Sequence, residues 1–434
     1  MAHALSNTAS PPVRQERPWV DPLAAFAALE AEAFALLLHD GRNGRARIFV
    51  WPEETVEGVE AAAFQRFGER FRDPVSDGLW AGLLGYDLAT AFEQVETPAP
   101  LWPVIAMGRY THWAEFDREG ESYVVHAPDA AGASRLIETL EAAAIQQPAP
   151  QSPARWAARW PQARYLDAAR RAVDYVHAGD VFQVNLAQVF DAGLGKGDTP
   201  LGYFTRLCGQ SPAPHAAYLR LDDERVVLTN SPERFLSVRD GEVEARPIKG
   251  TRPRRSDPAA DQAEIDALSA SAKDRAENLM IVDLMRNDLS RVCRPGSVAV
   301  PVLCEVESYA NVHHLVSVVR GQLNEDRDLV DLIAASFPPG SITGAPKVRA
   351  MEIIAELEGE PRGPYCGALG WLSRDGNMDL NVMIRTAALR REPDGWTASI
   401  RSGGGIVADS EPLAEYEETL AKASALKAAL GRLA

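Results

Sequence analysis

The amino-acid sequence predicts an α+β fold built mostly from antiparallel sheet. Strand-like and helix-like segments both run through the 434 residues, but they do not alternate one for one. In the last part of the chain, several strand-like runs follow one another directly. This order favours antiparallel pairing over a doubly wound parallel sheet. Hydrophobic residues make up 46% of the chain and charged residues 24%, as in an ordinary globular protein.

The N-terminal part is expected to hold a short tail and one subdomain. Residues 1–18 are polar and contain proline, with no apolar core of signal-peptide length, so we expect a disordered N-terminus. Residues 19–150 form the predicted N-terminal subdomain, and the Gln- and Pro-rich residues 146–153 form the one clear boundary. Within the subdomain we expect strands at 33–38, 46–51 and 79–86 and a helix over 128–145.

The second part, residues 151–434, carries longer patterns. It begins with an amphipathic helix over 165–177 that Gly179 should end. A long helix is predicted over about 271–292, and a last helix should start near Ser410. The other expected elements are strands at 181–190, 215–221, 225–230, 312–323, 366–373, 378–390 and 396–401 and helices at 329–336 and 348–357.

Charge and cysteine content narrow the function classes. The net charge is -16 and no basic block stands out, so we expect neither nucleic acid nor an anionic membrane as a partner. The four cysteines are isolated, which fits a reducing cytosol rather than a disulfide framework. No run approaches the roughly 20 apolar residues of a membrane span. These features predict a soluble cytoplasmic protein.

Lys249 is the most unusual residue. It lies in residues 246–251, which follow Val243 and Ala245 and read as a strand ending in a turn. Because alternate residues of a strand share a face, Lys249 falls on the apolar side with Val243 and Ala245. The side chain could snorkel to the sheet edge. Alternatively, burial lowers its pKa and leaves a free amine, which is a nucleophile.

Carboxylates occupy two predicted helices. Glu277 shares a face of the long helix with Ile281 and Leu284, so it needs a cation, which could be Lys273 or a metal. In the last helix, Glu415, Glu418 and Lys422 follow the spacing i, i+3, i+7 and form one ridge. Such a ridge is commonly a solvated face. Two helices that both turn carboxylates inward would instead suit Mg²⁺.

Two glycine-containing segments could approach a ligand. Residues 340–347 resemble a phosphate loop but lack its Lys-Ser/Thr ending, so we expect at most an anion held at the N-terminus of the following helix. Residues 402–406 read as a glycine turn. Arg385 could pair with a substrate carboxylate or with a surface acid.

Two further side chains could line a site. His313 and His314 are adjacent in a strand-like run, so one should point inward and the other outward. Glu233 precedes Lys249 by 16 residues, about right for the opposite strand of one hairpin, so it could pair with Lys249 or act as an acid or base.

Together these segments resemble the chorismate-utilising enzymes, and most of all the aminodeoxychorismate synthase component I branch. The resemblance is strong over about residues 165–425 and weaker before 150, where Gly85-Tyr86-Asp87 is a family landmark. It implies an α+β fold in which both parts of the chain interleave in one large, mostly antiparallel β-sandwich surrounded by helices. The matching segments are residues 183–188, 231–235, 247–251, 274–289, 314–317, 340–347, 403–407 and 415–419.

The resemblance also implies a reaction, the Mg²⁺-dependent conversion of chorismate to 4-amino-4-deoxychorismate for p-aminobenzoate and folate synthesis. By position, Lys249 would attack C2 of the ring and Glu233 would assist loss of the C4 hydroxyl. Glu277 and Glu418 would hold Mg²⁺, with Glu415 close by. The substrate-binding residues carried over are His314, Thr343, Tyr365, Arg385, Gly403, Gly404, Gly405 and Lys422.

The resemblance also implies that ammonia comes from a separate glutamine amidotransferase subunit, and none of the four cysteines of this chain lies in a nucleophile motif of that enzyme. The family's tryptophan pocket carries a serine where this chain has Asp40, so an amino-acid pocket in the N-terminal subdomain is not carried over intact. That subdomain could also provide the surface for the partner.

Three alternatives stay open. Component I of anthranilate synthase shares the substrate, the carboxylates and the glycine segments, but resembles Pro-Ile-Ala-Gly-Thr where this chain has Lys249. Isochorismate and salicylate synthases carry their catalytic lysine elsewhere. A non-catalytic binding subunit would be expected to lack some of Glu233, Lys249, Glu277 and Glu418, and all four are present.

Overall fold

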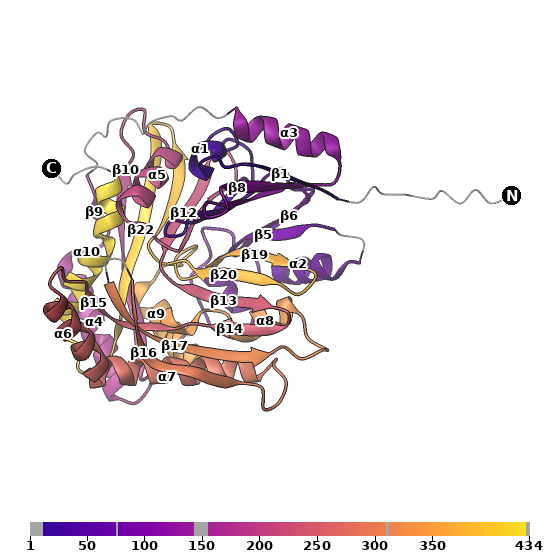
Figure 1. Ribbon diagram of the computed structural model, residues 1–434. Helices are drawn as coiled ribbons and strands as arrows, with labels where there is room; N and C mark the ends of the chain where they lie inside the picture. Colours follow the sequence, from indigo (N-terminus) through magenta and orange to yellow (C-terminus); the bar gives the residue numbers. More distant parts are fainter. Residues whose placement is uncertain (1–11, 75–76, 143–154, 310–311, 431–434) are drawn as a thin grey trace.

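A computed structural model describes residues 12–74, 77–142, 155–309 and 312–430. Within these residues the chain forms two large antiparallel sheets with helices on their outer faces (Figure 1). The predicted α+β class and the predominance of antiparallel pairing are therefore confirmed. The proposed boundary at residues 146–153 lies outside the described residues.

The first sheet has twelve strands in the described residues. Its strands come from both sides of residues 146–153, so neither part of the chain forms it alone. In spatial order they are β1 (Val13–Pro18), β8 (Ser122–Ala127), β7 (Trp113–Asp117), β3 (Arg45–Phe49), β2 (Leu36–Asp40), β11 (His215–Arg220), β12 (Arg225–Ser231), β21 (Thr386–Glu392), β22 (Gly395–Ile406), β10 (Gln183–Gly193) and β18 (Gly344–Ala345), with β9 (Ala157–Ala158) beside β10.

The second sheet has ten strands in the described residues and also mixes both parts of the chain. In spatial order they are β15 (Ile248–Pro253), β17 (Val312–Gln322), β14 (Glu242–Ala245), β13 (Arg234–Arg239), β20 (Met378–Val382), β19 (Ala368–Ser373), β5 (Leu79–Leu84), β6 (Ile105–Tyr110) and β4 (Glu54–Gly58), with β16 (Ala299–Ser308) beside β17.

Three large apolar cores hold these layers together, and a small fourth cluster joins Leu268, Cys304 and Leu315. The smallest of the three large cores lies between the sheets and joins Leu36 and Leu219 of the first sheet to Leu83 and Leu369 of the second. The other two lie on the outer faces, under helices. Helices α1 (Pro22–Phe26), α3 (Ala130–Glu141), α5 (Pro200–Gln210) and α10 (Pro412–Ala429) cover the first sheet, and α2 (Ala62–Arg72), α4 (Gln162–His177), α7 (Ala272–Ser290), α8 (Leu329–Ser336) and α9 (Lys347–Glu358) contribute to the core on the second.

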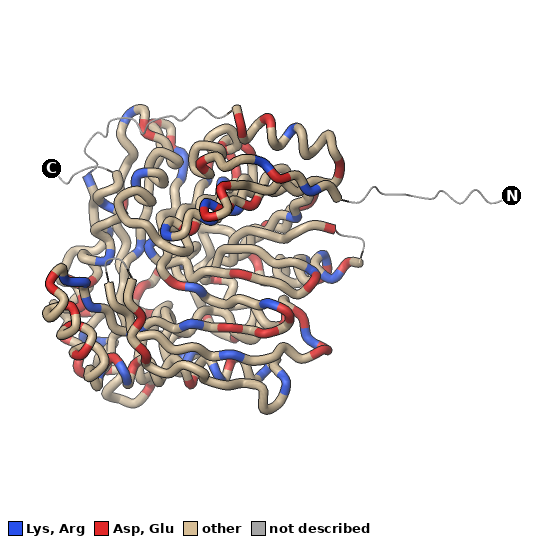
Figure 2. Tube along the Cα trace, viewed as in Figure 1, with Lys and Arg blue, Asp and Glu red and all other residues tan. Residues whose placement is uncertain are grey.

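Several short elements complete the chain. The helix α6 (Pro258–Ala270) packs beside β15 and was not expected from the sequence. Two 3₁₀ turns, η1 (Tyr86–Ala91) and η2 (Gly340–Ile342), follow β5 and α8. No helix in the described ranges combines the length and apolar character needed to cross a bilayer. Acidic and basic residues are intermixed along the trace (Figure 2).

The structure corrects three local predictions. The expected disordered tail ends earlier, because Val13–Pro18 pair with β8 as strand β1. The expected strand over 378–390 is two strands in different sheets, β20 and β21, separated at Arg385, which has a φ of 52°. The expected glycine turn at 402–406 is the last part of strand β22. Apolar alternation alone carries no signal for a change of sheet or for glycines inside a strand.

Candidate active site

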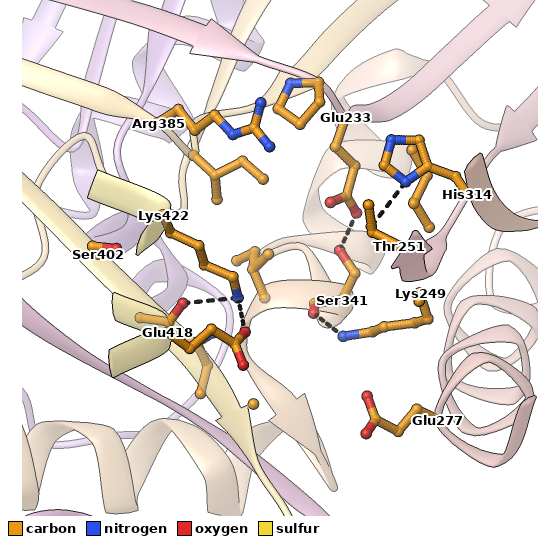
Figure 3. A pocket seen from close by; sticks show the side chains of 18 of the residues that line it. Glu233, Lys249, Thr251, Glu277, His314, Ser341, Arg385, Ser402, Glu418 and Lys422 are labelled. Carbon is orange, nitrogen blue, oxygen red and sulfur yellow. Dashed lines mark hydrogen bonds and ion pairs between the residues drawn. The ribbon is translucent and has the colours of Figure 1, made fainter. Parts of the chain in front are cut away.

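A cavity of about 590 Å³ lies where strands of both sheets meet helices α7 and α10. It collects residues from segments that are far apart in the sequence (Figure 3). Most of the predicted site residues line it, whereas Thr343 and Gly404 do not. Those that line it are Glu233, Lys249, Glu277, His314, Tyr365, Arg385, Gly403, Gly405, Glu415, Glu418 and Lys422.

The strand register brings Lys249 to this cavity. Strands β14 and β15 pair with β17 in one continuous register, in which Ala245 lies opposite Val319 and Lys249 opposite Leu315. The alternation that begins at the buried Val243 therefore extends to Lys249, as the sequence predicts. The face of the strand on which Lys249 lies was predicted correctly, but strand β15 continues past Lys249 to Pro253.

A bulge at Gly250 takes the place of the expected turn. The register with β17 shifts between Lys249 and Thr251, and Gly250 has a φ of 75°. A Cβ atom at Gly250 would lie 2.8 Å from Cδ1 of Leu268 and 2.9 Å from Cγ of Asp274. Glycine is thus required by both the backbone conformation and the space.

The Lys249 amine is held by a loop carbonyl. Its Nζ donates a hydrogen bond to the backbone oxygen of Ser341 at 3.0 Å. Burial lowers the pKa of Lys249, while the negative charges of Glu233 and Glu277 oppose that shift. The amine therefore releases its proton more readily than an exposed lysine does, which favours nucleophilic attack.

Glu233 lies on the other side of the same loop. It is 6% exposed, and its Oε1 accepts a hydrogen bond from the Ser341 hydroxyl at 2.6 Å. Burial raises the pKa of Glu233, and the Ser341 hydroxyl and the Lys249 charge reduce that rise. The carboxyl group therefore keeps its proton to a higher pH than usual, as a general acid requires.

Ser341 contacts both groups and was not singled out from the sequence. Its backbone carbonyl accepts a hydrogen bond from Lys249, and its hydroxyl donates one to Glu233. Its place in residues 340–347 was the available signal, but that segment was read as an anion-binding loop. Lys347 instead pairs with Asp288 of α7 at 2.7 Å, and the Thr343 hydroxyl donates to the Pro339 oxygen at 2.9 Å, so both side chains are bonded to other parts of the protein.

Arg385 and His314 occupy the cavity wall in different charge states. The backbone oxygen of Arg385 accepts a hydrogen bond from the N–H of Asn230, but its guanidinium has no hydrogen-bond or ion-pair partner among the residues that the structure describes and is free to receive an anion. Burial and the nearby Arg42 lower its pKa. Burial also lowers the pKa of His314 to about 4, so the imidazole is neutral near pH 7, and its Nδ1 lies 3.0 Å from the Thr251 hydroxyl.

The predicted outward and inward histidines are both buried. His313 contacts Asp261 through Nε2 at 2.9 Å, on the side of α6, whereas His314 lines the cavity. The two side chains do leave the strand in different directions, but α6 covers His313, so neither histidine faces solvent.

The carboxylates of α7 and α10 face the cavity from two helices. Burial raises the pKa of Glu277 and of Glu415, and the neighbouring Glu418 charge raises both further. Lys422 pairs with Glu418 at 2.5 Å. Lys273 pairs with Asp409 at 3.9 Å rather than with Glu277, although the charges of Lys249 and Lys273 reduce the rise in the pKa of Glu277. Figure 3 shows Glu277 and Glu418 directed into the same space.

This donor set fits a magnesium ion that keeps water and substrate ligands. No group of three or more His, Cys, Asp or Glu side chains in the described ranges is arranged to hold a metal by itself. Mg²⁺ commonly binds through one or two carboxylates with water and substrate oxygens. The mutual repulsion of these carboxylates is the feature that such a cation would relieve.

The glycines of β22 allow residues of β10 and α10 to lie close to its backbone. A Cβ atom at Gly403 would lie 2.4 Å from the Leu186 oxygen, and one at Gly405 would lie 1.7 Å from Nε2 of Gln183. A Cβ atom at Gly404 would lie 3.2 Å from the Glu415 carboxylate. The three glycines therefore let β10, β22 and α10 come together around the cavity.

A separate cavity of about 680 Å³ lies beside Asp40 and is lined by residues of both parts of the chain. Asp40 accepts hydrogen bonds from the backbone N–H groups of Arg42 and Asn43, so its carboxylate is tied to its own turn. The guanidinium of Arg47 lies over the ring of Trp371 in the same cavity.

Sequence similarity to known proteins extends along nearly the whole chain. The family described as chorismate binding enzyme matches residues 10–428. Aminodeoxychorismate synthase component 1 of Klebsiella aerogenes is 40% identical over 92% of this chain and 94% of its own length. Anthranilate synthase component 1 of Streptomyces coelicolor is 43% identical over 67% of this chain and 55% of its own length.

A solved structure shows the same fold. Anthranilate synthase component I from Streptococcus pneumoniae superimposes with a TM-score of 0.74 at 28% identity, covering 98% of this chain and 94% of that one. The family match, the coverage of the relatives and the shared fold all support the same family assignment. The chain belongs to the chorismate binding enzyme family and is a homologue of aminodeoxychorismate synthase component 1.

Proposed function

We propose that this protein aminates chorismate at C4 and so forms 4-amino-4-deoxychorismate, a precursor of p-aminobenzoate. The observation that carries the proposal is the position of Lys249, a lysine with a lowered pKa that lines the same cavity as the buried Glu233 in a chain of the chorismate binding enzyme family. An alanine at this position would leave no amine to attack the ring.

The residues support a two-stage displacement. In the first stage the Lys249 amine bonds to C2, the two ring double bonds shift from C1=C2 and C5=C6 to C1=C6 and C4=C5, and the C4 hydroxyl leaves as water with a proton from Glu233. In the second stage ammonia bonds to C4, the double bonds return, and the bond from C2 to Lys249 breaks. The proton that ammonia loses returns to Glu233 or to the lysine, so atoms and charges balance.

Charged groups around the cavity suit a dicarboxylate. Arg385 offers a guanidinium with no competing acid among the described residues, and Lys422 adds an ammonium group next to Gly403, whose oxygen it contacts at 3.2 Å. Tyr365 and the neutral His314 complete the wall. Glu277 and Glu418, with Glu415 close by, would hold Mg²⁺, which when bound neutralises substrate carboxylate charge.

Ammonia would reach this site from a separate glutamine amidotransferase subunit. The name of the Klebsiella relative, component 1, supports a synthase of more than one component. All four cysteines are buried and have no disulfide partner, and burial raises the pKa of Cys208 and Cys366 to about 12. Those two thiols are therefore unsuited to release ammonia from glutamine.

The product identifies the function. Purified protein with chorismate, Mg²⁺ and ammonium should form aminodeoxychorismate, detected as p-aminobenzoate after addition of the lyase that removes pyruvate. Anthranilate as the main product would overturn the proposal and assign the chain to the anthranilate branch.

A further inference from the structure

One part of the active-site wall has open space on both sides. Tyr365 and Arg401 line the active-site cavity and also a second cavity of about 370 Å³. Close packing holds most buried side chains in place, but Tyr365 and Arg401 have packing neighbours on fewer sides because a cavity lies on each side of them. Polar contacts must therefore contribute more to the position of this part of the wall.

Arg362 supplies several of those contacts. Its guanidinium donates to Glu358 through Nε at 3.1 Å and Nη2 at 2.6 Å. Nη2 also donates to the backbone oxygen of Asn185 at 2.9 Å, and Nη1 to that of Ile342 at 3.4 Å. The guanidinium carbon lies 5.7 Å from the centre of the Tyr365 ring. Asn185, Ile342 and Tyr365 all line the active-site cavity.

Asp87 fixes the backbone that carries Arg362. Its carboxylate is 4% exposed and accepts the N–H groups of Arg362 at 3.1 Å and Gly363 at 2.8 Å. The N–H of Tyr86 donates to the Gly363 oxygen at 2.8 Å, and the Tyr86 ring lies 4.8 Å from the Arg362 guanidinium carbon. Tyr86 and Asp87, which have no role in the mechanism above, thus hold the turn that leads to Tyr365.

We propose that Asp87, Glu358 and Arg362 are positioning residues that hold the active-site wall for turnover of chorismate. The inference rests on the proposed function only in placing the reaction in this cavity. Arg362 acts on the chemistry through Ile342, the neighbour of Ser341, whose carbonyl and hydroxyl hold Lys249 and Glu233. A shift of this loop changes the approach of the amine and the carboxyl group to the ring. Misplacement by about 1 Å can cost roughly a hundredfold in rate.

The test compares two arginine-to-lysine exchanges. Arg362→Lys keeps the charge but loses the fork that reaches Asn185 and Ile342. Arg220→Lys is the matched control, because Arg220 is 7% exposed, pairs with Glu30 and lines neither of these two cavities. The readouts are the melting temperature, the Kd for chorismate, and kcat and KM from the loss of chorismate. Loss of substrate is followed rather than a named product, so a wrong product assignment leaves this test valid.

We expect both variants to melt at lower temperature and only Arg362→Lys to lose about tenfold to a hundredfold in kcat/KM, with an altered pH profile. Equal kcat/KM for the two variants, within about twofold, would mean that the cluster serves stability alone and would overturn the proposal. If Arg362→Lys does not fold, Asp87→Asn is the second variant. It should lower kcat/KM at least tenfold, and unchanged turnover in that folded variant would contradict the inference.

Discussion

Lys249 and Glu233 have pKa shifts in opposite directions for the same reason. Burial disfavours the charged form of each group, so the lysine loses its proton more easily and the glutamic acid holds its proton longer. Both shifts favour the proposed roles, because they increase the fraction of neutral amine at Lys249 and of protonated carboxyl at Glu233. Ser341 lies between the two side chains, because its carbonyl accepts a hydrogen bond from Lys249 and its hydroxyl donates one to Glu233.

Glu233→Gln tests the role of the acid. The amide can still accept the Ser341 hydrogen bond, so the cavity should keep its shape and the Kd for chorismate should change little. Removal of the proton donor should lower kcat by about 10²–10⁴-fold. The wild-type rate should rise as Lys249 loses its proton and fall as Glu233 loses its own, whereas the variant should keep only the rise.

The measurement is kcat between pH 5 and about 10 for both proteins. This range lies between the unperturbed pKa values of glutamate and lysine. A variant that retains the fall at high pH would show that another group donates the proton.

At the scale of elements, strand β15 determines where the amine lies. Its register with β17 continues that of β14, and the bulge at Gly250 then redirects the chain immediately after Lys249. The face of Lys249 could be predicted because alternation is local. The bulge could not, because it depends on Leu268 and Asp274, which arrive from helices α6 and α7.

Gly250→Ala tests this arrangement. The positive φ alone costs about 1–2 kcal/mol for a residue with a side chain. The contacts with Leu268 and Asp274 should add to that cost and displace Lys249, so turnover should fall about tenfold or more while the protein still folds. Urea unfolding and kcat together check both effects.

Gly376→Ala is the matched control for backbone strain. Gly376 has a φ of 90° in the described hairpin between β19 and β20, and no atom lies within 4 Å of a Cβ added there. It should lose a similar free energy of unfolding for φ alone and keep full activity. Equal loss of activity in both variants would show that general destabilisation, rather than the bulge, is responsible.

At the scale of the whole molecule, the site exists only because the two sheets are combined. Lys249 and His314 come from one sheet, Gly403 and Gly405 from the other, and Arg385 lies where the chain passes between them. The helices with Glu277 and Glu418 were predicted, but their approach to one cavity follows from packing between distant segments. Ser341 and the Arg362 cluster were missed for the same reason, since their roles depend on partners far away in sequence.

The central claim is that Lys249 forms a covalent bond with chorismate. Protein incubated with chorismate and Mg²⁺ but without ammonium should accumulate an adduct that contains chorismate minus one water. After acid quenching and proteolysis, mass spectrometry should find that added mass on the peptide that carries Lys249. The Lys249→Ala variant should bind chorismate in calorimetry and form no adduct. If the wild-type protein aminates chorismate once ammonium is supplied, yet no adduct is found on this peptide in its absence, the account is contradicted.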